Sequence, residues 1–190
     1  MRRVAIAAGF LLASLALFSA QAAAGVPWLH IHVQDGGPDP ENVRVNVPAS
    51  LVDAVMPEIE KKTRHESKFD VGDCEMTVAE YRRSIRSLNS SPRREVKLDN
   101  PHGTVVLKRQ GPDLILTQTP KRKHRTATKV RMPWYVATAL AKGAGNTLDV
   151  SGAVHALAAE GKGEIAVEKE DGSRIRVWVD EVAFPPDADV

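Results

Sequence analysis

The 190-residue sequence contains a single cysteine, Cys74. One cysteine cannot form a disulfide within the chain, and it cannot supply the several thiolates of a cysteine-rich zinc site. In an oxidising compartment a lone thiol is either buried and inert or able to react with another molecule. We expect Cys74 to be inert, and a reactive thiol paired with His65 is the alternative.

Aromatic residues are scarce, and neither sign of charge is in clear excess. Phe, Trp and Tyr make up 5% of the chain, and 26 Lys and Arg stand against 24 Asp and Glu. Arg2 and Arg3 belong to the leader described below, so the rest of the chain carries 24 charges of each sign. A neutral chain with few aromatic residues lacks the basic, stacking surface of a nucleic-acid-binding protein. We therefore expect no nucleic-acid partner.

Familiar catalytic motifs are also missing. The sequence has no Gly-x-Ser-x-Gly, no His-Glu-x-x-His and no phosphate-binding glycine loop. Ser50, Ser84 and Ser151 stand at helix positions that capping or packing explains. We expect a non-catalytic protein without a cofactor, and an enzyme with an unrecognised site is an alternative.

The first 24 residues have the three zones of a secretory signal peptide. Arg2 and Arg3 precede an apolar run from Val4 to about Phe18, and small residues follow. The apolar run is short for a membrane span, although an uncleaved anchor is the alternative. We expect residues 1–24 to be removed and the remaining chain to be exported, periplasmic or extracellular, without a transmembrane segment.

The rest of the chain repeats one pattern. Residues 43–55, VRVNVPASLVDAV, align with residues 128–140, TKVRMPWYVATAL, when Pro48 is placed over Pro133. Three further blocks align in the same order: 29–33 with 114–118, 76–85 with 148–157, and 94–110 with 163–180. Four blocks in one order indicate an internal duplication.

Each repeated unit has the signals of two strands, two helices and two more strands. Leu29, Ile31 and Val33 alternate with polar residues, which predicts a half-buried strand. Proline after the second strand suits the first turn of a helix. Thr77 with Glu80 predicts a capped second helix, and Asp149 takes the same place in the second unit.

Two such units predict an α+β fold of two tandem ββααββ repeats, with a mostly antiparallel sheet and helices packed on one face. The pattern leaves open whether the units form one sheet or two. The predicted boundaries are residues 25–111 for the first repeat, 112–182 for the second and 183–190 for a C-terminal tail.

The V-R-V-x-V-P-x-x-L-V-x-A-V block, with the capped helix and strand pair that follow, resembles tandem modules of uncharacterised bacterial envelope proteins. Some of these modules occur in envelope-stress proteins of the YvlB/LiaX type. The resemblance covers most of the chain after residue 24 and rests on apolar patterning. It implies this fold and an interaction role in the envelope, and it carries no catalytic residue to transfer.

His30 and His32 stand two apart in WLHIHV, so on a strand both imidazoles point to one face. We expect an exposed strand face, because the equivalent positions of the second unit are Ile115 and Thr117. The alternative is a periplasmic metal-binding protein that uses His30 and His32. A further metal ligand would come from His65, Glu66, Asp70, Asp73, Cys74 or His102.

Two charged segments are candidate binding surfaces. The first unit has a charged insertion within residues 60–75, which we expect to be a solvated loop on which binding was added. Residues 119–131, TPKRKHRTATKVR, contain six Lys and Arg and no acid, which suits an anionic partner, with a solvated hairpin tip as the alternative. The expected partner- or anion-binding residues are Lys121, Arg122, Lys123 and Arg125.

The sequence therefore favours an exported, non-catalytic protein of the bacterial envelope. Its expected partner is an envelope protein or an anionic envelope component, bound through the two charged segments.

Overall fold

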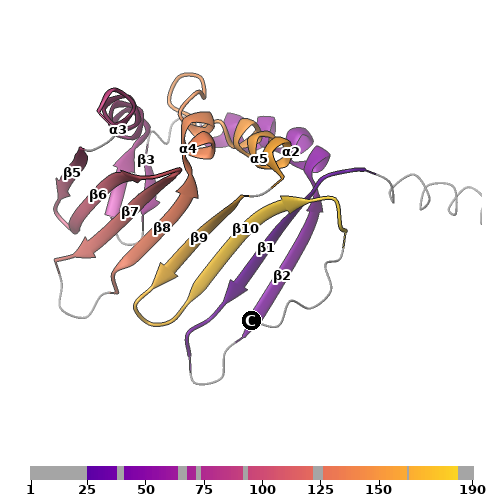
Figure 1. The fold of residues 1–190 in the computed structure, drawn as a ribbon, viewed down its shortest axis with the longest axis horizontal. Coiled ribbons are helices and arrows are strands. Elements are labelled where there is room, and N and C mark those ends of the chain that lie inside the picture. Colours follow the sequence, from indigo (N-terminus) through magenta and orange to yellow (C-terminus); the bar gives the residue numbers. More distant parts are fainter. Residues whose placement is uncertain are drawn as a thin grey trace, which may run out of the picture.

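The fold is shown in Figure 1, a computed structural model that describes residues 25–37, 41–63, 68–71, 74–91, 94–121, 126–161 and 163–183. The predicted signal peptide, residues 1–24, and residues 184–190 of the predicted tail lie outside the described residues. In chain order the elements are β1 (Trp28–Gln34), β2 (Asn42–Pro48), α2 (Ala49–Thr63), β3 (Lys68–Val71), β4 (Cys74–Thr77), α3 (Val78–Ser90), β5 (Glu95–Asn100), β6 (Gly103–Gln110), β7 (Asp113–Pro120), β8 (Thr128–Pro133), α4 (Trp134–Leu140), α5 (Val150–Glu160), β9 (Glu164–Lys169) and β10 (Arg174–Asp180).

Eight strands form one antiparallel sheet in the order β2-β1-β10-β9-β8-β7-β6-β5, and β3 pairs with β4 in a separate two-stranded sheet. Figure 1 shows the helices gathered on one side of the large sheet, with β2 and β5 at its opposite ends. The prediction of an α+β protein with a mostly antiparallel sheet is confirmed.

Strands from the N-terminal and C-terminal parts of the chain are neighbours in this sheet. β1 pairs with β10, and β6 pairs with β7. The predicted boundary at residue 111 falls in the tight turn between β6 and β7, where Gly111 has a φ of 60°. The two predicted units are thus joined through one continuous sheet.

The helices bury two apolar clusters against the sheet. In one cluster Leu88 of α3 and Leu107 of β6 are fully buried. In the other, Leu29 of β1 lies among Val136 of α4 and Leu157 of α5. Burying a side chain of this size contributes about 1.5–3 kcal/mol, so these clusters are the main force that holds the helices on the sheet.

Both predicted helix caps are confirmed. At the start of α3 the Thr77 hydroxyl accepts a hydrogen bond from the Glu80 N–H at 3.1 Å, and the Glu80 carboxylate accepts one from the Thr77 N–H at 2.9 Å. At the start of α5 the Asp149 carboxylate accepts a hydrogen bond from the Gly152 N–H at 2.7 Å. No helix among the described residues combines the length and apolar character that crossing a bilayer requires.

The charged insertion at residues 60–75 differs from its prediction as a solvated loop. Its described residues end α2 and then form β3 and the first half of β4. Val71 and Cys74 are buried, as is Met76 beside them, and all three belong to the apolar cluster beneath α3. Residues 64–67 and 72–73, which include His65, Glu66 and Asp73, lie outside the described residues.

Arg82 of α3 fastens the segment that follows α4. Its guanidinium donates hydrogen bonds to the carbonyl oxygens of Ala141 at 3.0 Å and Thr147 at 2.7 Å, and to those of Gly143 and Gly145. Carbonyls at a helix end have no partner within the helix, so a cation with five donors can satisfy several of them at once. This one side chain therefore joins the N-terminal and C-terminal parts of the molecule.

Candidate functional site

The two histidines of β1 lie on the face of the sheet opposite the helices. Leu29 and Ile31 pack into the helix-side cluster, so the alternate residues His30 and His32 point the other way. His30 is 1% exposed and His32 is 8% exposed. The expectation of an exposed histidine face is therefore wrong, because neighbouring strands supply side chains that cover both rings.

His30 is held by three neighbours from β2 and β10. Its Nδ1 lies 2.7 Å from Asn46 Oδ1, and its Nε2 lies 3.0 Å from Asp180 Oδ1. The Trp178 ring stacks on the imidazole with centroids 5.0 Å apart. Both ring nitrogens of His30 are thus engaged by polar side chains of the two neighbouring strands.

Asp180 is the acceptor at the centre of this cluster. Its carboxylate accepts hydrogen bonds from the Trp178 indole N–H at 3.0 Å and from the Val182 N–H at 2.8 Å. Burial alone would raise the pKa of Asp180, but these two donors and His30 lower it below its ordinary value. Asp180 is thus held as a carboxylate that fixes His30 and Trp178.

A second polar group continues along the same face. Arg176 Nε and Nη2 donate to Glu164 Oε2 at 2.9 and 2.7 Å, and Arg131 Nη2 donates to Glu164 Oε1 at 3.1 Å. The Arg176 guanidinium also lies over the Trp178 ring, 5.6 Å from its centroid. Both arginines of this group form ion pairs with Glu164, so this face of the sheet is polar and its charges are paired.

These contacts give little support to the alternative of a metal site at His30 and His32. Both ring nitrogens of His30 are engaged with Asn46 and Asp180, which leaves neither free to ligate a metal ion. His32 Nε2 is buried without a hydrogen-bond partner. Within the part of the chain that the structure describes, no group of three or more His, Cys, Asp or Glu residues is placed to hold a metal ion.

Cys74 lies on the other side of the sheet, in the apolar cluster beneath α3. It is fully buried, and its sulfur accepts a hydrogen bond from Gln118 Nε2 at 3.4 Å. A Cβ added at Gly103 would lie 2.8 Å from this sulfur, so the thiol fills the space beneath the β5–β6 turn. Its surroundings are those of a packed core residue.

The basic segment between β7 and β8 is described only at its ends. Lys121 is exposed, and its ammonium donates a hydrogen bond to the Asn100 carbonyl oxygen at 2.7 Å. Arg122, Lys123 and Arg125 lie outside the described residues. The anion-binding role of this segment stays a prediction.

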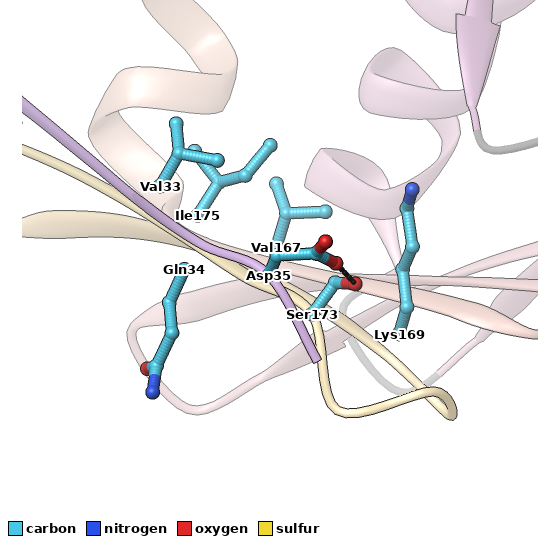
Figure 2. Close-up of a pocket in the computed structure, with 7 residues that line it drawn as sticks. All are labelled: Val33, Gln34, Asp35, Val167, Lys169, Ser173 and Ile175. Atoms are coloured by element: carbon cyan, nitrogen blue, oxygen red, sulfur yellow. Dashed lines mark hydrogen bonds between the residues drawn. The ribbon is translucent and has the colours of Figure 1, made fainter. Parts of the chain in front are cut away.

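Sequence reasoning missed a hollow on the helix side of the sheet. Figure 2 shows Val33, Val167 and Ile175 pointing to the same side of the sheet, with Gln34 on the other. The hollow has a volume of about 180 Å³. At its rim the Ser173 hydroxyl lies 3.3 Å from Asp35 Oδ1, a contact that ties the β1 end to the β9–β10 turn.

Exposed apolar side chains gather on the neighbouring element pair. Of the five large hydrophobic residues that are exposed in the described chain, four belong to β2 and α2: Val43, Val45, Leu51 and Val55. We refer to these four residues as the β2–α2 corner. Val43 lies opposite Val33 in the β1–β2 pairing, so the corner adjoins the hollow.

In the comparisons with known proteins, no family model, no curated protein and no solved structure matches this chain. Function is therefore inferred from the contacts of its own residues.

Proposed function

We propose that this protein is an exported, non-catalytic interaction protein of the bacterial envelope, and that it binds a partner protein through the β2–α2 corner. The observation that carries the proposal is the exposure of Val43 and Val45, which are 52% and 41% exposed on a strand with one neighbour in the sheet. Their side chains alternate with Arg44, so they share the helix side of the sheet.

An edge strand of this kind is a ready partner for another strand. Natural proteins protect such edges with lysine, proline or a bulge, because an unprotected edge pairs with other chains. β2 ends at Pro48 and carries the exposed Arg44, but it also presents two exposed valines, and the following helix adds Leu51 and Val55, 49% and 44% exposed. Backbone pairing along an edge combined with apolar contact beside it is the mode of strand addition.

The non-catalytic part of the proposal is supported by the polar cluster on the opposite face. A catalytic base must reach the proton that it removes, whereas His30 is 1% exposed and bonded through both ring nitrogens. Asp180 is in turn occupied by Trp178 and Val182. These contacts hold three strands together and are explained by that role.

Export and location in the envelope rest on the pattern of residues 1–24 and on the resemblance of the 43–55 block. The basic residues from Lys121 to Arg125 offer a second contact, to an anionic envelope component. Cell fractionation with intact-mass measurement tests export: the processed protein should lack Met1 and leave the cytoplasm, and retention of the whole chain in the cytoplasm contradicts it.

Site-specific photocrosslinking in cells tests the contact surface. A photoreactive amino acid at Val45 should give discrete crosslinked bands, whereas the same probe at the exposed Arg83 of α3 should give none. Val43→Lys, placed on the probe-bearing chain, should remove the Val45 bands. Equal crosslinking at both positions, or no crosslinking at Val45, contradicts the proposal.

A further inference from the structure

The strand pairings of the sheet repeat along the chain. In β1·β2, Leu29 lies opposite Val47, and in β7·β8, Leu114 lies opposite Met132. Both partners advance by 85 residues, from 29 to 114 and from 47 to 132. The same step separates Pro48 from Pro133 in the sequence alignment.

Two further pairings correspond in the same way. Glu95 lies opposite Lys108 in β5·β6, and Glu164 lies opposite Trp178 in β9·β10. The two pairs are equivalent in the sequence alignment, in which the β9–β10 turn has one residue more than the β5–β6 turn. The pairing of β1 with β10 corresponds to that of β7 with β6: Leu29 lies opposite Val179, and Leu114 lies opposite Arg109. These shared registers support a duplication in which β1, β2, β5 and β6 are equivalent to β7, β8, β9 and β10.

One pairing has no counterpart among the strands that the structure describes. β8 pairs with β9 at the centre of the sheet, and its equivalent would be β2 with β5. Those two strands are the opposite ends of the sheet (Figure 1), so a single molecule leaves both as edges. We propose that β2 of one molecule pairs with β5 of a second copy of this chain, in the register that β8 and β9 use.

Two of the four cross-strand pairs that this register would form are complementary, and the other two would be Val43 with Asn100 and Asn46 with Lys97. In β8·β9, Lys129 lies opposite Glu168 and Val130 lies opposite Val167. The equivalent positions place Arg44 opposite Asp99 and Val45 opposite Leu98. All four side chains are accessible to a partner strand: the Asp99 side chain is 60% exposed, Arg44 and Val45 are exposed, and Leu98 is half-buried.

The faces agree as well as the residue types. Val45 and Leu98 both lie on the helix side, as Val130 and Val167 do, because each alternates with a charged residue of the opposite face. Opposite charges across an antiparallel pair stabilise it, and like charges directly opposite destabilise it. The contact would therefore pair Val45 with Leu98 on one face and Arg44 with Asp99 on the other.

This contact uses two different surfaces, so it is head-to-tail and yields a closed ring or a growing chain of molecules. It rests on the proposed function and names the partner of the β2–α2 corner as the protein itself. It also gives the exposed Val45 of β2 an apolar partner, because its equivalent in β8, Val130, lies opposite Val167 of β9.

Charge reversal in the exported, processed chain tests the pairing by sedimentation velocity. The unaltered protein should associate as its concentration rises from about 1 to about 200 μM, a range suited to weak to moderate contacts. Arg44→Asp alone and Asp99→Arg alone should each associate about tenfold more weakly, because each sets like charges opposite one another. Arg83→Asp on α3 is the control and should associate as the unaltered protein does.

Recombining the two changes gives the decisive result. An equimolar mixture of the Arg44→Asp and Asp99→Arg proteins should regain association, and so should a single chain that carries both changes. Association of Asp99→Arg at full strength would overturn the proposal, because it would mean that β2 pairs with something other than β5. Circular dichroism of each variant separates loss of association from loss of folding.

The outcomes also separate this inference from the proposed function. If the unaltered protein stays monomeric throughout the concentration range while the Val45 probe still crosslinks to a different protein, the self-pairing is wrong and the interaction role stands. If neither association nor crosslinking occurs, both are wrong.

Discussion

The segments β1-β2-α2 and β7-β8-α4 have the same strand register, but equivalent positions can be exposed in the first segment and buried in the second. Leu51 in the first turn of α2 is 49% exposed, whereas Val136, 85 residues later in α4, is fully buried. The first segment ends the sheet, and the second lies in its interior. The difference shows that a local pattern sets which residues are apolar, and that neighbouring elements set which of them become core.

The first strands of these segments, β1 and β7, also have different surroundings on the face of the sheet opposite the helices. His30 and His32 of β1 correspond to Ile115 and Thr117 of β7. β1 lies between β2 and β10, so His30 meets Asn46 and Asp180. β7 lies between β6 and β8, where its equivalent positions meet no such pair of acceptors. The polar cluster around His30 therefore depends on the position of β1 between β2 and β10 in the sheet.

Cutting the chain between the two segments should have the largest effect. Residues 112–183 contain β7 to β10, but β10 would lose β1 and β7 would lose β6. We expect this fragment to show no cooperative thermal transition by circular dichroism, although residues 25–183 should show one. A cooperative transition in the fragment would mean that the C-terminal unit has a core of its own.

Arg82→Ala should break the contact that holds the second segment in place. Its guanidinium binds carbonyls on the loop between α4 and α5, and hydrogen bonds from charged groups contribute about 1.5–3 kcal/mol. We expect a loss of about 2–3 kcal/mol in the free energy of unfolding, measured by urea titration. Arg83→Ala, at an exposed position, should change it by less than about 0.5 kcal/mol; equal losses would contradict the role of Arg82.

Matched truncations measure the difference in burial directly. Val136→Ala should lower the free energy of unfolding by about 1.5–2 kcal/mol, because a fully buried valine loses its transfer free energy. Leu51→Ala removes a larger group but should cost less than about 0.5 kcal/mol in the monomer. Chemical denaturation at low protein concentration gives both values, and a larger loss for Leu51→Ala would mean that α2 is covered in solution.

Titration of Asp180 should give the smallest effect and sharpen the comparison of the two strand faces. The folded protein lowers the pKa of Asp180 below its ordinary value of 3.8, so the carboxylate stabilises the fold above that pH. This contribution is lost as the pH falls from about 5 to about 2, through the lowered pKa. The free energy of unfolding of Asp180→Asn should fall less steeply over this range than that of the unaltered protein.

Trp178→Phe is the companion variant, because it removes one donor to Asp180 and keeps the aromatic ring. Its pH dependence should lie between those of Asp180→Asn and the unaltered protein. Identical slopes for all three proteins would mean that Asp180 contributes nothing to acid stability.

Features that depend on residues close in sequence were predictable. Alternation identified β1 and β2, and the spacing of Thr77 and Glu80 identified the start of α3. β3 and β4 were missed because each is four residues long in a highly charged stretch. The spacing of Cys74 and Met76, both buried, is the signal that could have revealed them.

The functional surfaces were harder to predict because their partners are distant in sequence. His30 meets an acceptor 150 residues later, and Arg82 meets carbonyls 59 to 65 residues later. No local pattern reports such contacts. The candidate residues His30 and Cys74 were identified from their residue types; a buried, inert Cys74 was expected, whereas only the fold revealed that His30 is buried.

The sequence by itself determined the strands of the large sheet, the helix caps and the hairpins between neighbouring strands of that sheet, since alternation, capping and short turns act between near neighbours. The tertiary structure decided that β10 lies beside β1, that β8 lies beside β9, and that β2 and β5 are edges. These choices depend on how the helices pack over the sheet and on loops that close over long stretches of chain. The physical reason is that burial and pairing between distant segments are properties of the whole fold, whereas the pattern within a segment records only which of its faces is apolar.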